Sequence, residues 1–129
     1  MNFERGEKFL VIGLGRSGKA VAEVLRSRGA EVYGVDEKPR AELAEAIAAI
    51  ESRGAHYVAP DQVGGLEQLS CAVLSPGVPL NGPLVRKVQA QNVPVYSEIE
   101  VAYRLCVAPI IAVTGTKGKS TTASLIGHL

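Results

Sequence analysis

The stretch Lys8-Phe9-Leu10-Val11-Ile12-Gly13-Leu14-Gly15-Arg16-Ser17-Gly18 decides how this chain folds. Its first five residues form an apolar run that is typical of a buried strand. The three glycines that follow have the spacing GxGxxG, and residues 16–28 then place apolar side chains on one helical face. Strand, glycine turn (residues 13–18) and helix in this order predict the first unit of a parallel α/β sheet.

Strands and helices alternate along the residues that follow. The apolar patterns predict strands over 31–35, 56–58, 71–74 and 93–96, and helices over 40–53, 83–91 and 97–105. Pro94 predicts an edge position or a strand end, and Ser97 with Glu100 has the pattern of a capping box. Gly64 and Gly65 indicate a loop or the end of a helix. We therefore expect a Rossmann-like, doubly wound, mostly parallel sheet with right-handed crossovers.

The composition excludes several classes of function. The chain has 129 residues, of which 47% are hydrophobic, and a formal net charge of +1, so no general attraction to nucleic acid or membranes is expected. No apolar run approaches 18 residues and no signal peptide precedes the first strand, so we expect a cytoplasmic protein. Cys71 and Cys106 lack the clustered spacing of a zinc site and are interpreted as reduced core residues.

The glycine turn predicts a phosphate site. Gly13 permits the tight turn, Gly15 lets a phosphate approach the backbone, and Gly18 lets helix and strand pack closely. The N-terminus of the helix then offers N–H groups and partial positive charge to an anion. Asp36 ends the second strand, where the ribose-binding acid of a dinucleotide site falls. NAD and the diphosphate of a uridine nucleotide both fit this pattern.

Ser75-Pro76-Gly77 follows the strand over 71–74. The carboxyl ends of parallel strands line the ligand crevice of such sheets, so the Ser75 hydroxyl is a candidate for contact with a diphosphate or a base edge. Pro-Gly pairs are also common in ordinary turns, and that interpretation stays open.

A second phosphate loop lies near the C-terminus. The apolar run 110–113 leads into Thr114-Gly115-Thr116-Lys117-Gly118-Lys119-Ser120-Thr121-Thr122, a shortened variant of the P-loop with Val113 in place of its first glycine. The backbone amides of residues 115–119 would surround a β-phosphate, Lys119 would span the β- and γ-phosphates, and the Ser120 hydroxyl would bind Mg²⁺.

The position of this second loop suggests two domains. We expect a substrate-binding domain over residues 1–107 and the start of a central ATP-binding domain over 108–129. Magnesium also requires carboxylates from a later strand. Because the sequence ends nine residues after Ser120, we expect no phosphoryl transfer by this chain alone. Residues 114–129 are expected to be mobile or to pair with a neighbouring copy, so that the chain could self-associate.

The two loops, their order and the segments between them resemble the Mur ligases of bacterial peptidoglycan synthesis, and most closely the members that add D-glutamate. The resemblance covers the whole chain. It rests on the glycine turn, Asp36, Ser75-Pro76-Gly77, the segment 97–100 and the second loop. Lys117 departs from the family, in which asparagine is frequent at this position, and an added cation there could alter the affinity for phosphates.

The resemblance implies an ATP- and Mg²⁺-dependent ligase that joins UDP-N-acetylmuramoyl-L-alanine to D-glutamate through an acyl phosphate. It implies Lys119 as a catalytic residue and Ser120 as a metal ligand. The residues that it implies for ATP are Gly115, Thr116, Lys117, Gly118, Lys119, Ser120 and Thr121. Those that it implies for the UDP part are Gly15, Arg16, Ser17, Asp36, Glu37, Lys38, Ser75, Pro76 and Gly77.

Two further expectations concern partners and the alternative function. The resemblance implies a monomeric full-length enzyme without nucleic-acid or membrane partners. The alternative is an NAD-binding dehydrogenase or a regulatory NAD-binding domain. The glycine turn and Asp36 favour that alternative, whereas Lys119 and Ser120 in the second loop favour the ligase.

Overall fold

The computed structural model of the chain describes residues 2–105, which form a sheet of five parallel strands in the order β3-β2-β1-β4-β5. The strands are β1 (Lys8–Ile12), β2 (Glu31–Val35), β3 (His56–Tyr57), β4 (Cys71–Leu74) and β5 (Val95–Ser97). The α-helices are α1 (Arg16–Ser27), α2 (Ala44–Glu51), α3 (Pro83–Ala90) and α4 (Glu98–Leu105). Two 3₁₀ helices are η1 (Arg40–Leu43) and η2 (Pro60–Gly65).

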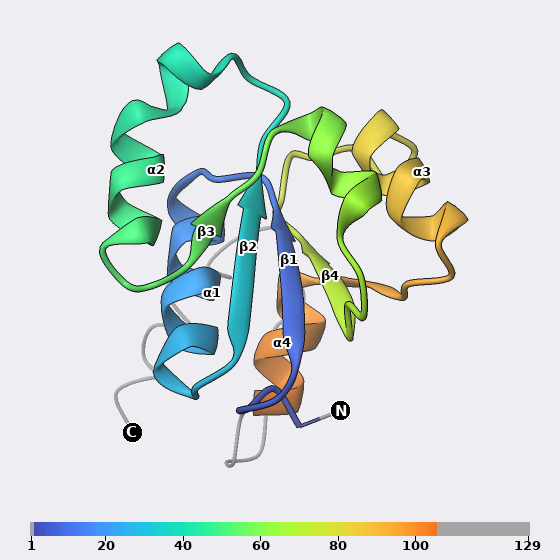
Figure 1. Cartoon of the computed structure of the whole chain (residues 1–129). Helices are drawn as coiled ribbons and strands as arrows, with labels where there is room; N and C mark the ends of the chain where they lie inside the picture. Colours follow the sequence, from blue (N-terminus) through green and yellow to red (C-terminus); the bar gives the residue numbers. More distant parts are fainter. Residues whose placement is uncertain (1, 106–129) are drawn as a thin grey trace, which may run out of the picture.

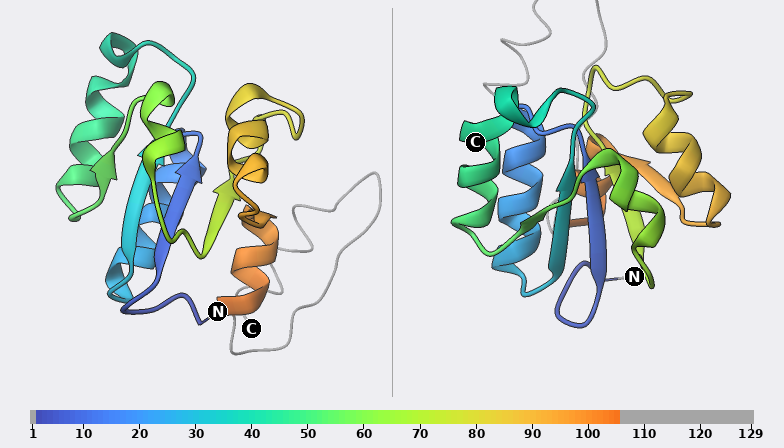
Figure 2. Two further views of the ribbon diagram at one scale, coloured as in Figure 1. Left: turned by 45° about the vertical axis from the view of Figure 1, so that its right-hand side comes forward. Right: turned by 45° about the horizontal axis from the view of Figure 1, so that its top comes forward.

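Helices cover both faces of the sheet (Figures 1 and 2). The central strands are buried on both sides, and their successive side chains alternate between two apolar clusters. Phe9 and Val11 of β1 belong to the cluster under α1, α2 and α4, whereas Leu10 and Ile12 belong to the cluster under η2 and α3. This confirms the predicted α/β class and shows that the described sheet is parallel throughout.

Several elements differ from the prediction by one or two residues at their ends or in the type of helix. The helix predicted over 40–53 begins as η1, in which the Glu42 N–H donates to the Pro39 carbonyl at 2.9 Å, three residues earlier. Gly64 and Gly65, expected in a loop or at the end of a helix, are the last two residues of η2, which agrees with the second alternative. The last strand begins at Val95 and not at residue 93, because the Val93 N–H still bonds back to helix α3.

Two local predictions around β5 can be compared with the structure. The strand after Pro94 lies at the edge of the described sheet, as its proline indicated. The Glu100 N–H donates to the Ser97 hydroxyl at 3.2 Å, which confirms one half of the capping box. Within the described residues the Glu100 carboxylate makes no return bond to the Ser97 N–H.

Several predictions concern residues outside the described part of the chain. They are the strand over 110–113, the second phosphate loop, the behaviour of residues 114–129 and the boundary between residues 107 and 108. Over residues 2–105, none of the helices has both the length and the apolar character needed to cross a membrane.

Candidate nucleotide-binding site

The ends of three neighbouring strands lie at the same level. Ile12, the last residue of β1, pairs with Val35 of β2 on one side and with Leu74 of β4 on the other. The next residues of the three strands, Gly13, Asp36 and Ser75, therefore meet at one edge of the sheet. The order of the strands also reverses between β1 and β4, and such switch points are where open α/β sheets bind ligands.

The glycine turn is fixed closely against this edge. The Gly13 N–H donates to the Val35 carbonyl at 2.8 Å, and Gly13 has a φ of +96°, which favours glycine. A Cβ at position 18 would overlap the Gly13 carbonyl oxygen and come within 2.9 Å of its carbonyl carbon. Helix α1 can therefore begin directly behind the turn only because residue 18 has no side chain.

The N-terminus of helix α1 opens at this edge without a side chain that caps it. Gly15 is the N-cap residue, no side chain among residues 2–105 makes a cap hydrogen bond to this end of the helix, and the first turn contains no acidic residue. The Lys19 N–H makes the bond to the Gly15 carbonyl at 3.0 Å, so the N–H groups of residues 16–18 precede the helical hydrogen bonds. A helix end of this kind attracts anions.

A cavity of about 430 Å³ lies over these strand ends and the helix N-terminus. Its lining includes all nine residues that the sequence analysis assigned to the UDP part of a substrate: Gly15, Arg16, Ser17, Asp36, Glu37, Lys38, Ser75, Pro76 and Gly77. Val78, Pro79 and Leu84 also line it and were not predicted. Val78 and Pro79 directly follow the Ser-Pro-Gly turn, which is the signal that could have indicated them, whereas Leu84 lies in α3.

Asp36 and Ser75 are the two predicted residues that bond to the glycine turn itself. Asp36 accepts the Leu14 N–H at 2.9 Å through Oδ2 and the Lys38 N–H at 2.9 Å through Oδ1. The Ser75 hydroxyl is buried and donates to the Gly13 carbonyl at 2.9 Å.

Ser75-Pro76-Gly77 forms a tight turn at the rim of the cavity. The Val78 N–H donates to the Ser75 carbonyl at 3.2 Å, and Gly77 has a φ of +91°. Proline second and a positive-φ glycine third are typical of a type II turn. The turn interpretation is therefore confirmed, and the same turn also borders the cavity, so contact with a ligand stays a prediction.

The charges around the cavity suit a ligand with two kinds of group. Arg16, in the first turn of α1, is an exposed cation that favours phosphate, and Lys38, beyond the end of β2, is a second exposed cation on the cavity. Asp36 and Glu37 are carboxylates on the opposite strand end, and such groups accept hydrogen bonds from hydroxyl or N–H groups of a sugar or base. Phosphates and hydrogen-bond donors on one molecule are the features of a nucleoside diphosphate.

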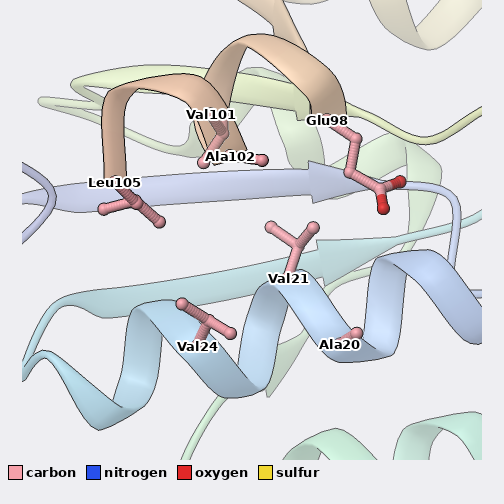
Figure 3. A pocket seen from close by; sticks show the side chains of 7 residues that line it. All are labelled: Ala20, Val21, Val24, Glu98, Val101, Ala102 and Leu105. Carbon is pink, nitrogen blue, oxygen red and sulfur yellow. The ribbon is translucent and has the colours of Figure 1, made fainter. Parts of the chain in front are cut away.

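A second cavity, of about 360 Å³, lies between helices α1 and α4 (Figure 3). Its lining is apolar apart from Glu98 and consists of Ala20, Val21, Val24, Glu98, Val101, Ala102 and Leu105. It offers no cation to a phosphate, so it is a poor candidate for the nucleotide site. Over residues 2–105, no three His, Cys, Asp or Glu side chains are grouped so that they could hold a metal ion.

The family described as Mur ligase MurD-like, N-terminal domain, matches residues 7–97, a range that contains the glycine turn and all nine lining residues. The chain belongs to this family. The match covers β1 through β5 and ends at the residue before α4.

Curated relatives extend the similarity beyond the N-terminal match. UDP-N-acetylmuramoylalanine–D-glutamate ligases from Alkaliphilus metalliredigens and Lactococcus lactis are 39% and 40% identical to this MurD-like chain, each over 97% of its length. The ligase from Thermoanaerobacter sp. is 41% identical, also over 97% of the chain. The chain spans only 28% of the length of each of these relatives.

Solved structures show the fold alone. A translation initiation factor from Pyrococcus horikoshii matches with a TM-score of 0.52 and 13% identity, over 73% of this chain and 40% of its own. A thermostable alcohol dehydrogenase from Pyrobaculum aerophilum matches with a TM-score of 0.52 and 16% identity, over 79% of this chain and 39% of its own. Both support the α/β architecture of the MurD-like chain.

Proposed function

We propose that this chain is the part of a D-glutamate-adding ligase that binds the uridine diphosphate end of UDP-N-acetylmuramoyl-L-alanine. One observation carries the proposal: in a chain of this family, the uncapped N-terminus of α1 and the ends of β2 and β4 converge on one cavity. The D-glutamate-adding activity is taken from the names of the relatives, which this chain matches over 28% of their length.

The chemistry of the cavity supports a division of roles. The N–H groups at the start of α1, together with Arg16 and Ser17, would bind the diphosphate. Glu37 and Lys38, beyond the end of β2, and Pro76 and Gly77, beyond the end of β4, would enclose the uridine. A substrate held at this end would leave its terminal carboxylate free to extend toward a separate catalytic site.

The second half of the proposal concerns ATP and rests on the sequence. Residues 115–121 would hold the phosphates of ATP, with Lys119 across the β- and γ-phosphates and Ser120 on Mg²⁺. The γ-phosphoryl group would pass to the substrate carboxylate with release of ADP. The amine of D-glutamate would then attack the acyl phosphate, which forms the amide and releases phosphate. We propose a cytoplasmic location, where ATP is available.

Calorimetry of this chain with UDP, a UDP-sugar and NAD tests the binding role. We expect UDP and the UDP-sugar to bind with a Kd between about 1 µM and 1 mM, and NAD not to bind. Arg16→Ala should weaken UDP binding about tenfold because a charge-assisted phosphate contact is lost. Arg53→Ala is the matched control. Arg53 is exposed, forms an ion pair with Glu23 at 3.1 Å, and does not line the cavity. Tight NAD binding with no response to UDP would show that the alternative function is correct.

A further inference from the structure

The glycine turn is held from both sides by side chains that come from other strands. On one side the Asp36 carboxylate, at the end of β2, accepts the Leu14 N–H at 2.9 Å. On the other side the Ser75 hydroxyl, at the end of β4, donates to the Gly13 carbonyl at 2.9 Å. The two bonds thus hold the carbonyl and the N–H of the peptide unit that joins Gly13 to Leu14. This unit lies immediately before Gly15, the N-cap residue of α1.

These bonds occupy the hydroxyl proton of Ser75 and one acceptor position on each oxygen of Asp36. The proton of the Ser75 hydroxyl points to Gly13, and the side chain is only 7% exposed, so it has no second proton to offer a diphosphate. Each oxygen of Asp36 already accepts a backbone N–H, from Leu14 and from Lys38. The second of these bonds also fixes the start of the segment that carries Lys38 into the cavity.

We propose that Asp36 and Ser75 are positioning residues, which set the orientation of the glycine turn so that its N–H groups meet the diphosphate. The inference rests on the proposed function, because it names residues of the same site. A turn with glycines at 13 and 15 has few preferred backbone angles of its own, so its shape depends on outside bonds. Asp36 and Ser75 supply those bonds from the two strands that flank β1.

The consequence of losing each bond follows from its chemistry. Asp36→Asn keeps the size of the side chain but replaces one acceptor oxygen by an NH₂ group, which would face either the Leu14 or the Lys38 N–H. Ser75→Ala removes the hydroxyl and leaves the Gly13 carbonyl without this donor. In both variants the turn should be free to leave the orientation that binds a diphosphate.

The test combines calorimetry with nuclear magnetic resonance of the 129-residue chain. UDP affinity is measured for the wild type, Asp36→Asn and Ser75→Ala. Without ligand, hydrogen exchange of the Leu14 amide and the carbonyl ¹³C shift of Gly13 report the two bonds separately. Asp61→Asn, at an exposed position of η2, and Ser52→Ala, whose hydroxyl donates to the Ala49 carbonyl at 2.7 Å, are matched controls outside the cavity.

We expect Leu14 exchange to become at least about tenfold faster in Asp36→Asn and the Gly13 carbonyl shift to move in Ser75→Ala, each with about a tenfold loss of UDP affinity. The controls should stay within about twofold of the wild type. A loss of UDP affinity with an unchanged Leu14 amide and Gly13 carbonyl would show direct contact with the ligand and overturn the inference. Altered signals with unchanged affinity would also overturn it. Failure of the wild type to bind UDP would instead refute the proposed function, and this inference with it.

Discussion

Position 18 of the glycine turn has no room for a side chain, because backbone atoms of Gly13 occupy the space. An added Cβ would overlap the Gly13 carbonyl oxygen, and backbone cannot move aside as a flexible side chain can. We expect Gly18→Ala to lower the free energy of unfolding by about 2 kcal/mol or more, measured by urea denaturation. Gly64→Ala is the control, because a Cβ there meets nothing within 4 Å, and it should change stability by less than about 0.5 kcal/mol. Equal effects of the two variants would contradict this account of the turn.

Cys71 gives the stability of the molecule a pH dependence. Burial raises the pKa of its thiol from 9.0 to about 12, and the nearby Glu7 carboxylate adds to the increase. The folded chain therefore keeps a proton that the unfolded chain releases above about pH 9, so stability falls as pH rises from there toward 12. Between pH 8 and pH 10 we expect the titration of this thiol to lower the free energy of unfolding by about 1.4 kcal/mol. In Cys71→Ala the free energy of unfolding should fall less over this pH range, as measured by urea denaturation at pH 8 and pH 10. An identical fall in the wild type and the variant would show that the thiol is not responsible.

The candidate site shows which residues a sequence can indicate. The patterns of GxGxxG, a strand-ending Asp36 and a Ser-Pro-Gly turn, together with the family resemblance that they support, indicated nine residues that line one cavity. The bonds that the Leu14 N–H donates to Asp36 and that the Ser75 hydroxyl donates to Gly13 could not be predicted, because they join residues 22 and 62 positions apart. The position of Val78 beside Gly13 likewise depends on the path of the loop after β4.

Helix α4 carries a carboxylate into an apolar groove. Glu98 points across the groove toward α1 (Figure 3), and its Oε2 is buried with no hydrogen-bond partner among residues 2–105. We expect Glu98→Leu to raise the free energy of unfolding by about 1 kcal/mol, because relief of the buried carboxylate exceeds the lost attraction to the helix N-terminus. Glu100→Leu, at an exposed position in the same first turn, should instead lower stability by about 0.3–1 kcal/mol. Denaturation curves in which both variants are destabilised alike would contradict this description of the groove.

Elements were easier to predict than their ends. The apolar runs of β1 and β4 are nearly continuous because these strands are buried on both faces. The start of β5 and the first turn of the helical segment after Pro39 depend on individual hydrogen bonds, from Val93 and Glu42. The apolar pattern does not register such bonds, so it placed the start of β5 two residues early and did not distinguish the 3₁₀ turn at residue 40 from the α-helix that follows it.

At the scale of the whole molecule, the account requires two separable nucleotide sites. In an intact ligase that carries this sequence, Lys119→Ala should abolish ATP-dependent amide formation, because the cation that spans the β- and γ-phosphates is lost. UDP binding should be retained, since the cavity that we assign to it is built within residues 2–105. Assays of product formation and of UDP binding measure the two effects. Loss of both in the same variant would show that the sites are not separate.

The most direct measurement is a crystal structure of this chain with UDP-N-acetylmuramoyl-L-alanine. The account predicts the diphosphate against the N–H groups at the start of α1, in the cavity of about 430 Å³ between the ends of β2 and β4. A diphosphate bound elsewhere, or a nicotinamide cofactor across the glycine turn in crystals soaked with NAD, would contradict it.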